Sequence, residues 1–335
     1  MALVSKRVVR TVLTAAGGAV LLAALVVTVA MIWLKAHEDE LVFAAARSRQ
    51  HLLTAFPVDA RQVAVPVRNS TDLAGLVFRA DGAADTGYWV LHLHGNADSA
   101  FSPWQVRHCE ALRRFGFNVM DIDYHGFGLT PGQPSEAQMY ADTEAAYQAL
   151  LQRGVDPDHV ILLGHSLGSG PAVLLATRHK AAALVLFGAF TSIPDAAASR
   201  YPYLPVRLAV SVQFNSLARM SDVHIPVIIA HSREDTLIPY AHALKLFAAS
   251  NEPKHLITFD TGSNDGFGGH VDTLFEHVDV LRSALAEMLP SLPPARSVTG
   301  MPGAGGPMAP VRAASTTSPG ALEYRATRNA GLAQW

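Results

Sequence analysis

The sequence predicts an α/β protein in which helices cover both faces of a mostly parallel β-sheet. Short apolar runs alternate with helix-like stretches between about residues 60 and 289, the pattern of strand–helix–strand units. The runs are almost continuously apolar and rich in β-branched residues, as expected for strands buried on both faces. A glycine–serine–glycine turn at 164–168 joins one such run to a helical stretch. In sheets of this type chemistry gathers at the carboxyl ends of the strands, so the residues that follow the strands are the candidates for a functional site.

The expected strands and helices follow one another in order along this region. RQVAVPV and LAGLVFRA form a leading pair of strands around a turn. Six further strands follow, with the sequences GYWVLHLH, FNVMDIDY, HVILLG, AALVLFG, PVIIAH and HLITFD. The stretch SEAQMYADTEAAYQALLQRG begins with Ser135 and Glu136 as helix-entry signals and ends on Gly154. In all, helices are expected at about 102–115, 135–153, 167–179, 239–249 and 272–288.

The composition fits one or two globular domains with a substantial core. The chain has 335 residues, of which 50% are hydrophobic and 16% charged. The formal net charge of −2 gives no indication of a nucleic-acid partner. Cys109 is the one cysteine in the sequence, so no intrachain disulfide can form, and we interpret it as a buried structural thiol.

The N-terminal segment has the features of a membrane anchor. Residues 11–34 contain no charged residue, and about 20 such residues are enough for a helix to cross the hydrocarbon core. Lys6, Arg7 and Arg10 precede the run, so we expect the N-terminus to be cytoplasmic and the chain after about residue 36 to be extracytoplasmic. A cleaved signal peptide is the alternative, but its apolar core is usually about 7–15 residues, shorter than this run. Residues 1–36 are therefore predicted to be a single-pass anchor in the lipid bilayer.

Three further segments complete the predicted domain organisation. Residues 37–59 are expected to be a linker, and residues 60–289 to be the α/β domain. Pro, Gly, Ser and Ala dominate from residue 290 to residue 335, and apolar residues do not recur there at the spacing of a helix or a strand. That composition predicts a mostly disordered tail.

The strongest chemical signal is the sequence VILLGHSLGSGPAVLLA, which contains Gly164-x-Ser166-x-Gly168 between a strand and a helix. A tight strand-to-helix turn holds its serine in a strained conformation with the hydroxyl exposed, so Ser166 is the candidate nucleophile. An ordinary glycine-rich turn that packs a helix on a sheet is the structural alternative. The backbone N–H of Leu167, the next residue, is a candidate donor to an oxyanion.

A second candidate site segment is LHLHGNADS, which also follows a strand. Enzymes of this architecture take their other oxyanion donor from the loop after an earlier strand, and here that donor is the backbone N–H of Asn96. His92 and His94 alternate on one strand face as metal ligands can, but no third ligand with suitable spacing follows. We therefore expect no metal, and a loop-organising role for His94.

The candidate acid lies in PVIIAHSREDTLIPY, where a strand leads into a loop. In this architecture the acid comes after the serine and before the histidine in the chain. Asp235 is the predicted acid, which would orient an imidazole and stabilise its charged form. Glu234 is the neighbour that competes for the same role, and a solvated acidic loop is the structural alternative.

Several motifs taken in order resemble the α/β-hydrolase superfamily, and specifically its single-span membrane-anchored branch. That branch includes the fission-yeast bud-emergence homologue and bacterial serine-aminopeptidase-like hydrolases. The similarity covers about residues 60–289 and implies a triad of Ser166, Asp235 and a histidine, with Asn96 and Leu167 as oxyanion donors. The motifs that carry it are LHLHGNADS, DIDYHGFGLTPGQPSE, LLGHSLGSG, FTSIPDAAASRYPYLPVRL and SREDTLIP.

The histidine is the open point, because relatives follow the last strand closely with Gly-His-Asn-Asp. Here an early alignment of TGSND puts Ser263 at that position, and a serine cannot act as the base at neutral pH. A later alignment, with an inserted TGSNDGF, puts His270 there at the start of the last helix. His277 lies two helical turns into that helix, a poor place for a base on a loop. We predict His270 as the base, with a surface histidine on a glycine-rich loop as the structural alternative.

The segment from about residue 190 to residue 220 predicts a short lid rather than a full cap domain. Its aromatic, leucine and valine side chains could line an acyl pocket or could pack the lid onto the body of the domain.

The sequence therefore predicts a membrane-anchored serine hydrolase that cleaves ester or thioester (acyl) bonds of a small-molecule or acylated substrate through an acyl-enzyme. No metal or organic cofactor is implied. A peptidase or amidase that uses the same triad is the alternative within this class. A non-catalytic binding protein with the α/β-hydrolase fold is the alternative from a different class, and Ser263 in place of the histidine would favour it.

Overall fold

The computed structural model describes residues 6–53, 56, 60–260 and 266–293. Ser263 and the part of the expected tail from residue 294 onwards lie outside these described residues.

Eight strands form one sheet in the order β1-β2-β4-β3-β5-β6-β7-β8. The β1–β2 and β2–β4 pairs are antiparallel, and every other pair is parallel. The pairing of Leu93 on β3 with Gly164 on β5 makes the two strands end side by side, so the loops that follow them are neighbours. The strands are β1 Ala60–Val65, β2 Leu73–Phe78, β3 Trp89–Leu93, β4 Asn118–Ile122, β5 Val160–His165, β6 Ala183–Phe187, β7 Val227–Ser232 and β8 Lys254–Phe259.

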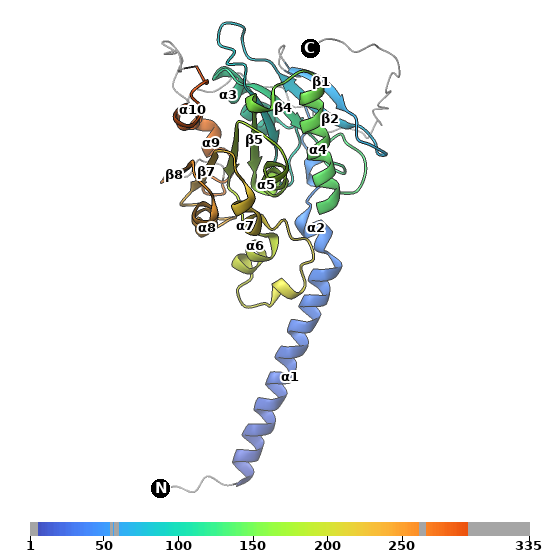
Figure 1. Ribbon diagram of the computed structural model, residues 1–335. Helices are drawn as coiled ribbons and strands as arrows, with labels where there is room; N and C mark the ends of the chain where they lie inside the picture. Colours follow the sequence, from blue (N-terminus) through green and yellow to red (C-terminus); the bar gives the residue numbers. More distant parts are fainter. Residues whose placement is uncertain (1–5, 54–55, 57–59, 261–265, 294–335) are drawn as a thin grey trace.

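Helices cover both faces of this sheet (Figure 1). One core cluster joins strand side chains to α4, α5 and α8, and the other joins the opposite strand side chains to α3, α9 and α10. Neighbouring residues of β5 show the division, since Leu162 belongs to the first cluster and Leu163 to the second. The predicted α/β-hydrolase fold, with a mostly parallel sheet between helices, is confirmed. The α-helices are α1 Lys6–Ala36, α2 Glu38–Val42, α3 Pro103–Arg114, α4 Glu136–Gln152, α5 Ser169–Arg178, α6 Ile193–Arg200, α7 Ser216–Arg219, α8 Ala241–Ala249, α9 Thr273–Glu276 and α10 Val278–Met288.

The helix limits follow from local hydrogen bonding. Ser135 caps α4 by accepting the N–H of Gln138, as its position in the sequence indicates. The helix expected at 272–288 is divided, because His277 has φ −126° and ψ 43°. The Nδ1 of His277 bonds to the Thr273 carbonyl, which a continuous helix would use for its own backbone ladder. Within the described residues there are also short 3₁₀ segments: η1 Arg47–Arg49, η2 Pro157–His159, η3 Ser166–Gly168, η4 Val206–Leu208 and η5 Met220–Asp222.

The N-terminal helix α1 projects away from the α/β domain (Figure 1). Its stretch Leu13–Ala36, 24 residues long, is long and apolar enough to cross a membrane. The chain after it, which we expected to be a linker, forms α2 and η1 and packs on the domain. Phe43 is 3% exposed and belongs to the core cluster of α4 and α5, because its ring stacks edge-on against Phe214.

The lid segment lies between β6 and β7 and consists of α6, η4, α7 and η5. Ser192 caps α6 by accepting the N–H of Asp195. In Figure 1, α6 and the yellow loop that follows it lie beside the upper end of α1.

Candidate active site

Ser166 occupies a strained turn at the carboxyl end of β5. Its φ of +49° is a conformation that non-glycine residues rarely adopt, and it raises the side chain out of the turn. Gly168 is required two residues later, because a Cβ there would lie 2.1 Å from the carbonyl oxygen of Leu93. The helix α5 begins immediately afterwards, at Ser169, so its N-terminal end faces the serine.

Three predicted site residues from three different loops meet here. The Nε2 of His270 lies 2.9 Å from Ser166 Oγ, and its Nδ1 lies 2.6 Å from Asp235 Oδ2. Because a carboxylate can only accept, the Nδ1–H donates to Asp235, and Nε2 is left to accept the hydroxyl proton of Ser166. The side chains of His270 and Asp235 are 3% and 0% exposed, so solvent competes little for these bonds.

Asp235 is held as an anion by its surroundings. Its Oδ1 accepts the N–H groups of Leu237 and Ile238, each at 2.8 Å. Burial opposes ionisation, but hydrogen bonds from His231 and His270 outweigh it and hold the pKa of this carboxyl well below its usual value. The competing residue Glu234 has an exposed side chain in the same turn.

The histidine loop is packed against the acid loop. A Cβ on Gly268, which has φ +68°, would lie 1.8 Å from the carbonyl oxygen of Glu234. The N–H of Thr236 donates to Phe267 O at 3.2 Å and joins the same two loops. His277 lies at the α9–α10 junction, where its ring packs against Phe259 instead of facing the serine.

Sequence reasoning missed three residues that hold this arrangement together. The Nε2 of His165 bonds to the carbonyl oxygen of His270 at 2.9 Å, and the Nε2 of His231 lies 3.1 Å from Asp235 Oδ2. His108 on α3 bonds to Asp272, two residues after the base, at 2.9 Å. The signal for the first two was present, since His165 is the last residue and His231 the last but one of a strand that leads into a predicted site loop.

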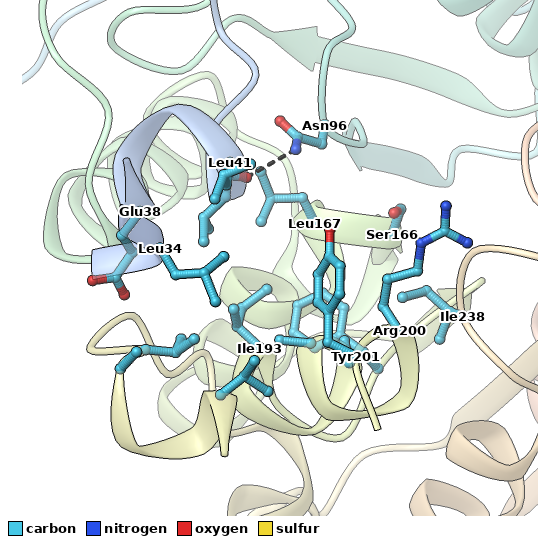
Figure 2. A pocket seen from close by; sticks show the side chains of 17 residues that line it. Leu34, Glu38, Leu41, Asn96, Ser166, Leu167, Ile193, Arg200, Tyr201 and Ile238 are labelled. Carbon is cyan, nitrogen blue, oxygen red and sulfur yellow. Dashed lines mark hydrogen bonds between the residues drawn. The ribbon is translucent and has the colours of Figure 1, made fainter. Parts of the chain in front are cut away.

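Asn96 and Leu167 both lie beside Ser166 on the wall of one pocket (Figure 2). Gly95 allows the loop to approach, because a Cβ there would be 3.2 Å from the Cβ of Ser166. The Asn96 side chain points away from the serine. It accepts the N–H of Ala44 and donates to Val42 O, both at 2.8 Å, so it joins the loop to the segment after α1.

The pocket has a volume of about 300 Å³ and is bounded by the end of α1, by α2 and by the lid. Among the lining residues that the structure describes, only Glu38 and Arg200 carry a formal charge, and most others are aliphatic or aromatic. An apolar pocket of this size suits an apolar ligand group. The lining residues are Leu34, Glu38, Leu41, Val42, Asn96, Ser166, Leu167, Phe190, Ile193, Ala196, Ala197, Arg200, Tyr201, Val206, Ala209, Val210 and Ile238.

A buried cluster near the site has the residue types of a metal centre. Ligand atoms of His92, Cys109 and Asp121 lie within 4.8 Å of one another, a grouping that sequence spacing did not reveal. Burial raises the pKa of the Cys109 thiol well above its usual value, and metals bind the thiolate. The Nδ1 of His92 already bonds to Asp121 Oδ2 at 2.9 Å. The cluster therefore fits a hydrogen-bonded core group better than a metal centre.

His94 and Asp123 organise the loops around the pocket. The Nδ1 of His94 bonds to Gly95 O at 2.8 Å. Asp123 accepts the backbone N–H of Ala100 and that of Leu129, each at 2.8 Å, and so ties the loop after β3 to the loop after β4.

Comparison with known proteins identifies the family. Residues 87–215 match the family described as serine aminopeptidase, S33. An uncharacterized protein of Mycobacterium tuberculosis (strain H37Rv) is 35% identical over 207 residues, which cover 61% of this chain and 73% of that protein. Alpha/beta hydrolase domain-containing protein 17B of Xenopus laevis is 32% identical over 207 residues, 61% of this chain and 68% of that protein. The chain belongs to the α/β-hydrolase family.

Solved structures of other α/β hydrolases share the fold. The esterase Pf2001 of Pyrococcus furiosus superposes with a TM-score of 0.57 at 17% identity, over 73% of this chain and 99% of that one. A puromycin-hydrolyzing peptidase of Mycobacterium tuberculosis superposes with a TM-score of 0.51 at 18% identity, over 70% of this chain and 40% of that one. Because the same fold serves an esterase and a peptidase, the bond that is cleaved has to be argued from the site.

Proposed function

We propose that this α/β hydrolase is a membrane-anchored serine hydrolase that cleaves the ester or thioester bond of an acyl substrate. The hydrogen-bonded chain from Ser166 through His270 to Asp235 carries the proposal. Its two distances, 2.9 Å and 2.6 Å, are within the range that proton transfer requires.

The proposed reaction has two halves. His270 Nε2 takes the proton of Ser166 as Oγ attacks the carbonyl carbon, and Asp235 stabilises the imidazolium that forms. The backbone N–H groups of Asn96 and Leu167 stabilise the oxyanion of the tetrahedral intermediate. His270 then protonates the departing alcohol or thiol, which leaves the acyl group on Ser166. A water molecule, deprotonated by His270, attacks this acyl-enzyme and releases the carboxylic acid and free Ser166.

The pocket favours an acyl substrate over a peptide with a free amino terminus. An aminopeptidase has to pair the cationic amine of its substrate with an acidic group. Among the pocket-lining residues that the structure describes, only Glu38 is acidic. Its oxygens already accept hydrogen bonds from Lys35, Ser211 and Val212, so it offers a poor site for an amine. A peptidase or amidase that uses the same triad is the second candidate, which the match to the serine aminopeptidase family favours.

Labelling with a serine-reactive fluorophosphonate tests the proposal. We expect the wild-type chain to label and Ser166→Ala not to label. A folded wild-type chain that stays unlabelled would favour a non-catalytic binding protein instead. Turnover of a p-nitrophenyl ester, compared with that of an aminoacyl p-nitroanilide, then separates esterase from peptidase activity.

A further inference from the structure

We propose that residues 34–44, the end of the membrane helix and the turn after it, form one wall of the acyl-binding site and do more than attach the domain to the membrane. In this view the segment sets the length of acyl chain that the enzyme accepts and holds the oxyanion loop in place. The inference rests on the proposed function and deepens it.

The first observation is that this segment lines the same cavity as the candidate nucleophile. Leu34 on α1 and Leu41 on α2 face the cavity opposite Ile193 of the lid, and Ser166 lies at its other end (Figure 2). Leu34 also belongs to the apolar stretch that is long enough to cross a membrane. An acyl group bound to Ser166 would therefore pack against the anchor itself.

The second observation is that Glu38 clamps this wall to the lid. Its Oε1 accepts the N–H groups of Ser211 and Val212 at 2.5 and 2.8 Å. Its Oε2 accepts the hydroxyl of Ser211 at 2.7 Å and the ammonium of Lys35 at 2.6 Å. The side chain of Glu38 is 7% exposed, so the clamp is largely shielded from water. Charge-assisted bonds of this kind are about twice as strong as neutral ones.

A second carboxylate continues the clamp along the lid. Glu136, at the start of α4, accepts the N–H groups of Gln213 and Phe214 at 2.7 and 2.9 Å. Four consecutive backbone N–H groups of the lid are thus held by two glutamates, one from the anchor side and one from the body of the domain. The anchor, the lid and the body therefore form one unit around the cavity.

The third observation is that Asn96 connects the wall to the oxyanion loop. Its side chain bonds to Ala44 N and Val42 O, while its backbone belongs to the loop that approaches Ser166. Loss of these two bonds would let the backbone N–H of Asn96 drift. A displacement of about 1 Å at a reacting centre can lower the rate by about 100-fold.

The chain-length test uses the full-length chain in detergent micelles with p-nitrophenyl esters from acetate to dodecanoate. Leu34→Trp should narrow the cavity and lower the ratio of kcat/KM for dodecanoate to that for acetate by about tenfold or more. Leu25→Trp is the matched control, because Leu25 lies on the same helix, is 60% exposed and does not line the cavity. Equal dodecanoate-to-acetate ratios in the two variants would contradict the proposal that this segment limits the length of the acyl chain. A wild-type chain that fails to label with fluorophosphonate would instead overturn the proposed function.

The positioning test separates a loop shift from a loss of stability. Asn96→Ala should lower kcat by about 10- to 100-fold for esters of every chain length and leave KM within about twofold. Asn251→Ala is the matched control, since the Asn251 side chain likewise makes two hydrogen bonds to the backbone, here by donating to the carbonyls of Ser221 and Val223, and lies outside the pocket. Equal kcat values in Asn96→Ala and Asn251→Ala would contradict the positioning role.

Discussion

At the scale of single residues, the candidate site depends on how neighbouring groups determine the protonation of Asp235 and the tautomer of His270. Asp235 stays anionic because backbone N–H groups and two histidines surround it, and an anionic acceptor fixes the tautomer of His270. That tautomer leaves Nε2 unprotonated and facing Ser166 at 2.9 Å. Asp235 therefore acts on Ser166 indirectly, because it sets which nitrogen of His270 is free to accept the serine proton.

His270→Ala is expected to lower ester turnover by about 10⁴-fold, because no other described imidazole bonds to Ser166. His277→Ala should lower it by less than about threefold, since that ring packs against Phe259 at the α9–α10 junction. Steady-state kinetics of the two purified variants makes the comparison. A larger loss in His277→Ala than in His270→Ala would overturn the assignment of the base.

Residue-scale sequence reasoning gave its most definite predictions where the signal was local. Ser166 could be singled out because five adjacent residues define its turn, and Asp235 because it follows a strand in the expected order. His270 required a choice between two alignments. The structure brings His270 to Ser166, and Ser263, the other alignment's candidate, lies outside the described residues. Its catalytic role is a proposal that the histidine variants test.

At the scale of loops and helices, contacts between distant segments decide what each segment does. Residues 37–53 have the composition of a connector, yet they pack on the domain because Phe43 enters the core and Glu38 pairs with the lid. The loop before His270 has the composition of an unstructured turn, yet Gly268 fits closely against Glu234. In each contact the partner lies far away in the sequence, so neither contact could be predicted from the local composition.

Gly268→Ala should lower turnover by about 100-fold, since the new Cβ would collide with the Glu234 carbonyl and displace the base. Gly266→Ala provides the matched control. Its φ of +76° is also positive, but nothing lies within 4 Å of an added Cβ, so only about 1 kcal/mol of backbone strain is expected. Similar kinetics for the two variants would mean that this contact does not position His270.

The Glu38 clamp should make stability depend on pH. Burial opposes ionisation of Glu38, but bonds from Lys35, Val212 and Ser211 outweigh it and lower its pKa from 4.5 to about 2. Because the folded-state pKa is the lower one, the stabilisation is complete above about pH 5 and is lost as the pH falls towards about 2.

Glu38→Gln should therefore lower the thermal unfolding midpoint at pH 7 by about 4 to 8 °C, on the basis of about 2 kcal/mol for lost charged hydrogen bonds. The difference from wild type should shrink as the pH approaches about 2. The exposed neighbour Glu40 supplies the control variant, Glu40→Gln, which should match wild type throughout. A difference that stays constant with pH would show that Glu38 is not ionised in the clamp.

At the scale of the whole molecule, the long apolar helix and the pocket are parts of one arrangement. The stretch that is long enough to cross a membrane ends at Ala36, and the pocket begins at Leu34 on the same helix. If α1 crosses a bilayer, the pocket lies at the membrane surface. From the basic residues Lys6, Arg7 and Arg10 at the start of α1, we then predict that the domain lies on the extracytoplasmic side.

A fusion of alkaline phosphatase after Leu289, expressed in a bacterial host, should be active, because that reporter works only outside the cytoplasm. A fluorescent protein that folds only in the cytoplasm should stay dark at the same position. The opposite pair of results would reverse the orientation. An N-terminal epitope tag should remain on the membrane-bound chain, and its loss would identify a cleaved signal peptide instead of an anchor.

The sequence by itself determined the fold class, the order of the elements and the loops that carry the candidate chemistry. These properties are local, since the burial of a strand on both faces, the capping of a helix and the nucleophile turn can each be predicted from a few adjacent residues. Only the tertiary structure decided which histidine meets Ser166, that α2 is a wall of the pocket, and that two glutamates hold the lid. Those facts depend on groups separated by up to 174 residues, as Glu38 and Val212 are, and such pairs leave no pattern in a single sequence.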